Sequence, residues 1–283
     1  MGGAGGMSNL NPFRRPLPGG TMPAVRASLA AALVALVAVL GVAAPGAPPA
    51  GPVVLFDQGH GQRFLIGGKG ALDLSNFASV VRARGGKTQA TKVALTPAAL
   101  DGVQALVVSG AFDKIRPDEV EAIAAFVEKG GRLAVMIHVE APVADLLHKF
   151  AISVSNGVIR EQAGVVGGDP LNFRVTRFGT HPLAKGLDSF AVYGAWALLP
   201  TSKTAQAIAV TGPTAWVDLN RNGKLEKGDA VQSFAVVVAG QQGRGGIVAF
   251  GDDALFQNKF LKDGNKRLAE NLAEWLLGKD PRP

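Results

Sequence analysis

The first part of the chain beyond residue 50 alternates short apolar runs with segments of helical periodicity. Apolar side chains recur at helical spacing from Leu74 to Val81 and from Val120 to Val127, and a glycine pair ends each helix. Strands that alternate with helices at this spacing predict βαβ units and a parallel sheet. The runs that predict the strands are Val53–Phe56, Thr91–Val93, Ala105–Ser109 and Arg132–Val139.

After about residue 150 the chain reads mainly as strands, with few helices between them. Gly246–Phe250 then returns to a buried apolar strand, and a closing helix carries Leu268, Leu272 and Leu276 on one face before Gly278. We therefore predict one α/β domain over residues 51–283, with a doubly wound core, a mainly parallel sheet and a β-rich insertion. The strands expected in the insertion are Phe173–Phe178, Phe190–Leu199, Ala205–Thr211, Ala215–Leu219 and Val231–Ala239.

The first 50 residues carry a targeting pattern. Residues 27–44 are an almost uninterrupted apolar run of 18 residues, with Arg26 immediately before it and a Pro/Ala-rich linker after it. A basic residue before an apolar stretch is typical of a secretory signal, and the run is also barely long enough to span a bilayer. We expect an extracytoplasmic protein, periplasmic or secreted, whose leader is either cleaved or retained as an inner-membrane anchor.

The absence of cysteine excludes disulfides, a thiol nucleophile and cysteine-based zinc sites. The net charge is +7, but three arginines lie in the leader, so residues 51–283 carry 26 basic against 22 acidic side chains, or +4. The basic residues are scattered and form no contiguous stripe of the kind that binds nucleic acid. We expect a small ligand or an envelope protein as the partner, and no nucleic acid.

Polar side chains gather at the expected carboxyl ends of the strands, where open parallel sheets bind ligands. Asp57, His60 and Gln62 follow the first strand on a glycine-bracketed loop, and His60 is able to act as acid, base or metal ligand near neutral pH. The alternative is structural, with Asp57 capping the loop and His60 bonding a backbone carbonyl. The other candidate ligand-binding residues at strand exits are Gly110, Asp252 and Asp253.

His138 and Glu140 follow the fourth expected strand, where many α/β enzymes carry a nucleophile. This turn holds no Ser or Cys, and nothing in the sequence nominates a third ligand for a metal held by these two side chains. We therefore favour a structural role for both residues over a metal site.

Segment 218–229, DLNRNGKLEKGD, matches the spacing of a calcium loop. Such loops place oxygen ligands at positions 1, 3 and 5, a glycine at position 6, a backbone carbonyl at position 7 and further ligands at positions 9 and 12. Two neutral Asn ligands and a final Asp predict a weak Ca²⁺ site with a structural role, and the alternative is an ordinary Asn-Gly hairpin turn. The residues at these positions are Asp218, Asn220, Asn222, Gly223, Lys224, Glu226 and Asp229.

Five segments, taken in their order along the chain, resemble those of one family of bacterial proteins. They are VVLFDQGHGQRF, GAFDKIRPDEVEAIAAFVEKGGRLAVMI, THPLAKGL, DLNRNGKLEKGD and GGIVAFGDDALFQNKFLKDGNKRLAENLAEWLLG. The family is DUF4350, which is similar to the class I glutamine-amidotransferase-like fold and to the GldG-type extracytoplasmic domain of gliding motility. The resemblance covers most of residues 51–283 and implies a flavodoxin-like α/β sandwich.

The amidotransferase relatives use a Cys nucleophile with a His–Glu pair, so amidase activity does not carry over to a chain without Cys. The resemblance therefore implies a non-catalytic ligand- or protein-binding accessory domain of the cell envelope, linked to a transport or motility system with an ABC transporter or ATPase as partner. The alternative is a metal-assisted hydrolase or sugar-modifying enzyme, in which Asp57 and His60 meet Asp252 or Asp253. A third interpretation is a purely structural envelope protein.

Overall fold

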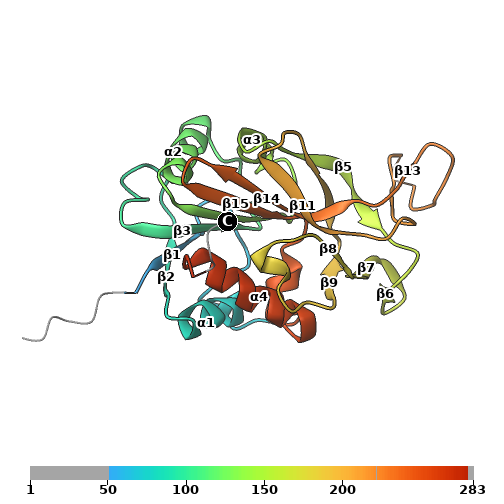
Figure 1. Ribbon diagram of the computed structural model, residues 1–283, viewed down its shortest axis with the longest axis horizontal. Coiled ribbons are helices and arrows are strands. Elements are labelled where there is room, and N and C mark those ends of the chain that lie inside the picture. Colours follow the sequence, from blue (N-terminus) through green and yellow to red (C-terminus); the bar gives the residue numbers. More distant parts are fainter. Residues whose placement is uncertain (1–50, 221, 280–283) are drawn as a thin grey trace, which may run out of the picture. The chain divides into compact units, whose positions relative to one another are not determined.

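The computed structural model describes residues 51–220 and 222–279. Over these residues the chain has a mixed α/β fold, with a 12-stranded sheet, a three-stranded sheet and helices on both faces of the larger sheet (Figure 1). The leader and linker expected over residues 1–50 lie outside the described residues. Within the described part of the chain, no helix has the length and hydrophobicity needed to cross a bilayer.

Five neighbouring strands form the parallel half of the large sheet, in the order β2-β1-β3-β4-β15. Every neighbouring pair among them is parallel, as the βαβ spacing predicts. Val107, Ala134 and Val248 have no exposed surface, and burial on both faces explains why the central strands are near-continuous apolar runs. The bounds are β1 (Val53–Asp57), β2 (Lys87–Thr91), β3 (Val103–Ser109), β4 (Arg132–Met136) and β15 (Gly245–Phe250).

The β-rich insertion extends the same sheet with antiparallel strands, so the prediction of a mainly parallel sheet is wrong for this half. β14 lies beside β15 and is joined to it by the two-residue turn Gly243-Arg244, and so short a connection joins only antiparallel strands. The sheet continues through β10 and β5 to β12 and β13, while β11 pairs with β14 and β8. The bounds are β5 (Ile152–Arg160), β8 (Arg177–Phe178), β10 (Trp196–Pro200), β11 (Ala205–Val210), β12 (Trp216–Val217), β13 (Ala230–Val231) and β14 (Ala235–Gln242).

Three more strands form the separate antiparallel sheet. The single strand expected over 190–199 is therefore two strands in different sheets, because Gly194, with φ of 90°, turns the chain between them. The second strand of the parallel half also runs over Lys87–Thr91 rather than 91–93. The bounds are β6 (Val165–Val166), β7 (Asp169–Val175) and β9 (Phe190–Tyr193).

Helices cover both faces of the parallel half, with α1 and α4 on one face and α2 and α3 on the other (Figure 1). Neighbouring residues of a strand point to opposite faces, so Val107 packs in the core with Leu272 of α4, whereas Leu106 packs in the core with Ile123 of α2. Two 3-10 helices complete the elements. The bounds are α1 (Ser75–Ala83), α2 (Pro117–Glu128), α3 (Ala144–Lys149), α4 (Asp263–Leu276), η1 (Pro182–Ala184) and η2 (Ala254–Phe256).

Two buried amides fix α4 against the insertion. Asn265 accepts from the Ala191 backbone N–H at 2.7 Å and donates to the Ala191 and Leu255 carbonyls at 2.9 and 3.1 Å. Asn271 donates to the Leu183 and Lys185 carbonyls at 2.9 and 2.8 Å. These bonds satisfy backbone groups that would otherwise be buried without partners, so the closing helix is attached to β9, η1 and η2 by polar contacts as well as by its apolar face.

Candidate functional site

The carboxyl ends of β1, β3, β4 and β15 meet at one edge of the sheet, and the expected site residues lie there in two groups. The first group, which we call the buried triad, consists of Asp57, His60 and Glu119. The second group, the exit pair, consists of His138 and Asp253. The sequence predicted that these strand exits carry a site, and the structure separates them into two hydrogen-bonded clusters.

The buried triad holds an imidazole ring between two carboxylates. His60 Nδ1 lies 2.8 Å from Asp57 Oδ2, and His60 Nε2 lies 3.2 Å from Glu119 Oε2. Gln62 completes the cluster, because its amide Nε2 donates to Asp57 Oδ2 at 2.5 Å and its Oε1 accepts from the His60 backbone N–H at 2.8 Å. The exposed fraction of each of these four residues is 9% or less. Both ring nitrogens of His60 are therefore occupied in a closed network.

Glu119 reaches the triad from the first turn of α2. This helix begins after Arg116 with a proline, which suits a helix N-terminus. Glu119 Oε2 accepts from the Arg116 backbone N–H at 3.2 Å, which is one half of a capping box, and Oε1 accepts from the Leu95 backbone N–H at 2.8 Å. One carboxylate thus connects the helix start, the segment at Leu95 and the loop after β1.

The electrostatics of the triad favour a charged imidazole. The hydrogen bond to Asp57 raises the pKa of His60 to about 9, with Glu119 contributing in the same direction against the effect of burial. Burial acts to raise the pKa of Glu119, but the bonds from Leu95 and His60 keep it below its usual value. The imidazole of His60 is therefore biased toward its cationic form at neutral pH, with a carboxylate beside each ring nitrogen.

The contacts of Asp57 and His60 match the structural interpretation of these residues. Asp57 caps its loop, because Oδ1 accepts from the Gly59 backbone N–H at 3.0 Å. His60 bonds carboxylates rather than the backbone carbonyl that the sequence suggested, and its own carbonyl accepts from the Phe112 and Asp113 backbone N–H groups at 2.9 and 3.0 Å. The loop after β1 is therefore fixed to the loop after β3.

The exit pair is more accessible. His138 Nδ1 lies 3.1 Å from Asp253 Oδ1, and the exposed fractions of the two side chains are 39% and 2%. Phe64 and Phe112 flank the imidazole, with ring centroids 5.3 and 5.1 Å from it. The Arg63 guanidinium lies 4.5 Å above the Phe112 ring. A half-exposed imidazole thus contacts two aromatic rings, and a cationic side chain lies over one of them.

Gly110 allows the carboxylate of Asp253 to sit against the end of β3. Its φ is 62°, and a Cβ at this position would lie 2.7 Å from Asp253 Oδ2 and 3.4 Å from the Phe64 ring. Asp253 Oδ2 and Ser109 Oγ are buried with no hydrogen-bond partner among the described residues. Buried polar atoms without a partner are uncommon in a native interior and call for an explanation such as a water, an ion or a catalytic role, so Asp253 distinguishes the exit pair from the fully bonded triad.

Burial also changes the protonation of the acidic residues here. The pKa of Asp252 is raised to about 8 by burial and by the neighbouring Asp253. Asp252 nevertheless accepts from the Tyr193 and Ala254 backbone N–H groups at 2.7 and 2.8 Å. Its carboxylate therefore bonds the end of β9 in the insertion and the start of η2. Burial raises the pKa of Asp253, although His138 acts in the opposite direction. The hydrogen bond to Asp253 raises the pKa of His138, so the accessible imidazole is also biased toward its cationic form.

The expected calcium loop connects β12 and β13, and its side chains bind its own backbone. Asp218 accepts from the Asn222 and Gly223 N–H groups at 3.1 and 2.6 Å, and Asp229 accepts from the Leu219 and Glu226 N–H groups. Among the described residues, no group of three or more His, Asp or Glu side chains is arranged so that it could hold a metal ion. Two further loop contacts join Asn220 to Glu226 and Asn222 to Lys224.

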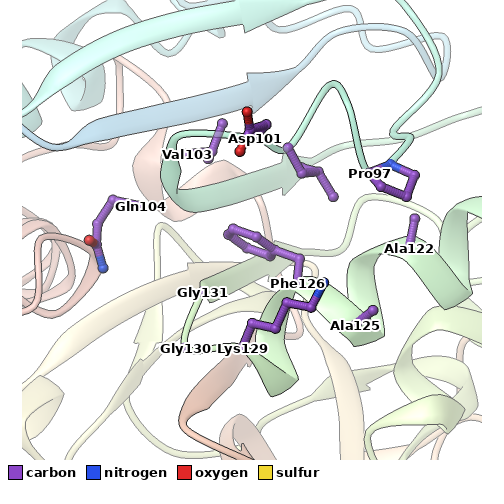
Figure 2. Close-up of a pocket in the computed structure, with 11 residues that line it drawn as sticks. Pro97, Asp101, Val103, Gln104, Ala122, Ala125, Phe126, Lys129, Gly130 and Gly131 are labelled. Carbon is purple, nitrogen blue, oxygen red and sulfur yellow. The ribbon is translucent and has the colours of Figure 1, made fainter.

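A cavity of about 380 Å³ lies at the opposite edge of the sheet, near the beginnings of β3 and β4. Phe126 is among the residues that line it, and the charged or amide-bearing ones are Asp101, Gln104 and Lys129 (Figure 2). The described residues that line it include no histidine. This cavity therefore contains none of the histidines of the two clusters at the carboxyl edge.

The sequence did not identify Glu119, Arg63, Phe64 or Phe112 as members of the edge. Glu119 carries a sequence signal, because a Glu at the third position of a helix is typical of a capping box, but its partner His60 is 59 positions away along the chain. Glu140 is not bonded to His138 in the structure, and the partner of His138 is Asp253, 115 positions away.

The triad predicts how stability depends on pH. Since folding raises the pKa of His60 from 6.5 to about 9, its contribution is complete below pH 6.5 and is lost as the pH rises through about 9, a loss of about 3 kcal/mol. In urea unfolding between pH 6 and pH 10, the wild type should show this decline and His60→Gln should have a flatter profile. His148→Gln, which changes an exposed histidine, should keep the wild-type slope, and an equal slope in all three proteins would contradict the assignment.

Known proteins give the following comparisons. No curated protein sequence matches this chain. Among solved structures, the mmIFT52 N-terminal domain has a TM-score of 0.66 at 18% identity, covering 82% of this chain and 100% of that one. The cytoplasmic protein STM1381 from Salmonella typhimurium has a TM-score of 0.51 at 14% identity, covering 79% and 98%. A putative ThuA-like protein from Bacteroides uniformis has a TM-score of 0.50 at 13% identity, covering 84% and 96%.

At these identities the structures share the fold with this chain and carry no functional assignment to it. The match to a family model is more specific, because it follows the chain from residue 71 to residue 273. That span includes Glu119, His138 and both carboxylates at the β15 exit. The protein belongs to the family described as "Domain of unknown function (DUF4350)".

Proposed function

We propose that this protein is an exported, non-catalytic binding module of the cell envelope and that its ligand contacts the exit pair. The observation that carries the proposal is the half-exposed imidazole of His138, whose Nδ1 is held by the buried carboxylate of Asp253 at 3.1 Å. A bond at Nδ1 fixes the ring and leaves Nε2 as the nitrogen that meets a ligand.

The surroundings of His138 indicate the kind of ligand. Small-molecule sites combine apolar and aromatic walls with a few convergent polar groups, and here Phe64 and Phe112 supply the walls. The cation of Arg63 and the raised pKa of His138 both favour a ligand that presents a negatively charged acceptor. A small carboxylate fits this chemistry.

Binding is favoured over covalent catalysis at this position. A hydrolase of the acyl-transfer type needs a hydroxyl or thiol bonded to its histidine. In the described part of the chain, no hydroxyl is recorded as a hydrogen-bond partner of the His138 ring, and the chain has no cysteine. The geometry therefore supports recognition of a ligand by a fixed imidazole.

The cellular setting of the proposal rests on the leader and on the fold. The apolar run 27–44 behind Arg26 supports export. The strand order β2-β1-β3-β4-β15, with helices on both faces, supports a flavodoxin-like core similar to the class I glutamine-amidotransferase-like fold. We extend the proposal to an accessory role beside an envelope transport or motility system, with an ABC transporter or ATPase as partner.

The ligand site predicts a binding experiment. Full-length protein with ¹⁵N-labelled histidine would be titrated with succinate, citrate and glutamate, and with glucose as the uncharged comparison. We expect a carboxylate to shift the His138 ring signals and to leave those of His60 unchanged. His138→Gln should weaken binding about tenfold or more, because a charged hydrogen bond is lost.

The control for this experiment is His148→Gln, which changes a histidine on α3 and should bind like the wild type. Asp253→Asn should also weaken binding, because the imidazole loses the charged partner that orients it. Equal binding by wild type and His138→Gln, or no response to any carboxylate, would show that the exit pair is not the ligand site.

We also propose that loop 218–229 binds Ca²⁺ weakly and that the ion stabilises the β12–β13 hairpin. A carboxylate has about four acceptor positions, so the two N–H bonds to Asp218 leave oxygen lone pairs for a cation. Gly223 has φ of 77°, which suits the tight turn that such a loop needs at position 6. Asn220, Asn222, the Lys224 carbonyl, Glu226 and Asp229 are the other proposed ligands.

Thermal melting tests the calcium proposal. Millimolar CaCl₂ should raise Tm by a few degrees relative to EGTA, because a ligand that binds only the folded state stabilises it. Asp218→Ala should abolish the shift. Lys224→Ala should keep it, since only the backbone carbonyl of that residue is proposed to bind. A wild type that melts at the same temperature in both buffers would make the loop an ordinary hairpin turn.

Export is tested by fusing residues 1–50 to alkaline phosphatase, which becomes active when its disulfides form outside the cytoplasm. The fusion should be active, and the double change Leu36→Arg and Leu40→Arg should abolish activity by interrupting the apolar run. Arg14→Ala, which leaves both the run and Arg26 intact, should have no effect. An inactive wild-type fusion that is present at normal levels would contradict export.

A further inference from the structure

A second cavity, of about 750 Å³, lies between the loop that follows β1, one side of α1 from its first to its last turn, and the segment Asn258-Lys259. Its lining includes three cationic side chains, Lys69, Arg82 and Lys259. The described residues that line it include no carboxylate. The volume is within the range of small-molecule sites, and the lining carries charge of a single sign.

In the described part of the chain, no ion pair is recorded for any of these three cationic side chains. The Arg82 guanidinium donates to the Thr88 and Ser79 hydroxyls at 2.9 and 2.7 Å, which are neutral groups. Lys259 Nζ lies 5.2 Å from the centre of the Phe260 ring. Lys69 is exposed, and no ion pair is recorded for it in the described part of the chain. A concave surface lined by one sign of charge concentrates ions of the opposite sign.

The loop that carries Lys69 is held in place by Asp73. One oxygen of this carboxylate accepts from the Leu65 backbone N–H at 2.9 Å, and the other accepts from the Gly70 backbone N–H at 2.8 Å. A Cβ on Gly68 would lie 2.2 Å from Asp73 Oδ2, so the loop closes this tightly only with glycine there. Asp73 is occupied by the backbone and does not line the cavity.

Asn258 connects the two walls of the cavity. Its side-chain amide donates to the Gly70 carbonyl at 2.8 Å and to the Ser75 hydroxyl at 3.0 Å, and its Oδ1 accepts from the Asn76 backbone N–H at 2.8 Å. The Lys259 backbone N–H donates to the Ala71 carbonyl at 2.7 Å. The segments that carry Lys69 and Lys259 are thus fixed to each other before any ligand arrives, which lowers the entropic cost of binding.

We propose that this cavity binds the phosphate group of a soluble phosphorylated small molecule. Lysine ammonium groups bind phosphate as point charges, and the two lysines and Arg82 together supply the positive charge that a phosphate dianion requires. The Ser75 and Ser79 side chains add hydroxyls to the lining. A Cβ on Gly67 would meet nothing within 4 Å, so the rim is open to the rest of the ligand at that point.

The site differs from a P-loop in how it would hold phosphate. The run Gly67-Gly68-Lys69-Gly70 lacks the spacing and the final Ser or Thr of that motif, and the Gly70 N–H is already bonded to Asp73. The Asn76 amide in the first turn of α1 is likewise bonded to Asn258. Side-chain charge, rather than a nest of free backbone amides, therefore carries the binding.

Calorimetry on the full-length protein tests the proposal with inorganic phosphate, glucose 6-phosphate and glucose. Both phosphates should bind and glucose should not. The double variant Lys69→Ala, Lys259→Ala should weaken binding at least tenfold, because two charge-assisted contacts are lost. The charge-matched double variant Lys203→Ala, Lys266→Ala changes exposed lysines that do not line the cavity and should bind within about twofold of the wild type.

Three results would overturn the proposal. Equal weakening by both double variants would mean that phosphate responds only to net charge. Equal binding of glucose and glucose 6-phosphate would mean that the phosphate group is not recognised. Binding to vesicles that contain phosphatidic acid, but to neither soluble phosphate, would exclude a soluble ligand. His138→Gln should leave phosphate binding unchanged. The phosphate experiment therefore tests this cavity independently of whether the exit pair binds a ligand.

Discussion

The carboxyl edge of the sheet depends on one buried cation. The imidazole of His60 lies between Asp57 at the end of β1 and Glu119 at the start of α2, and Glu119 also holds the backbone at Leu95. Two buried carboxylates cannot both stay ionised without such a partner, because an uncompensated buried charge costs several kcal/mol. Three segments that are distant in sequence are therefore fixed relative to one another by the position of one ring.

This network also positions the residues proposed to meet a ligand. The His60 carbonyl accepts the backbone N–H groups of Phe112 and Asp113, and the Phe112 ring packs against His138. The triad itself is closed, with both imidazole nitrogens bonded, whereas the exit pair leaves an imidazole exposed and a carboxylate oxygen without a partner in the described residues. A His–Asp pair is thus fully enclosed at one strand exit, whereas at the other the carboxylate is buried and the imidazole is partly exposed.

The sequence predicted the parallel core well because burial on both faces produces apolar runs that are readable without neighbours. It located the strand exits for the same reason, but it could not pair His138 with Asp253, since that contact requires knowing that β4 and β15 are adjacent. The antiparallel half was less readable: β5 mixes polar and apolar residues, and Gly194 divides one apolar run between two sheets. Asn265 appears as a surface residue of an amphipathic helix, yet tertiary contacts bury it.

The loop after β1 serves both proposed sites, and its attachment makes them independent. Gln62 joins the loop to the triad at one end, and Asp73 closes it at the other. Phe64, between these points, packs on His138, whereas Lys69 lines the cationic cavity. A ligand shifts an equilibrium between two conformations only if it binds them with different affinity. A loop that is held at both ends has a single conformation for either ligand to bind. Coupling between the sites would therefore require release of the loop, and the loss of the His60 proton near pH 9 is the change in this network that would weaken its hold.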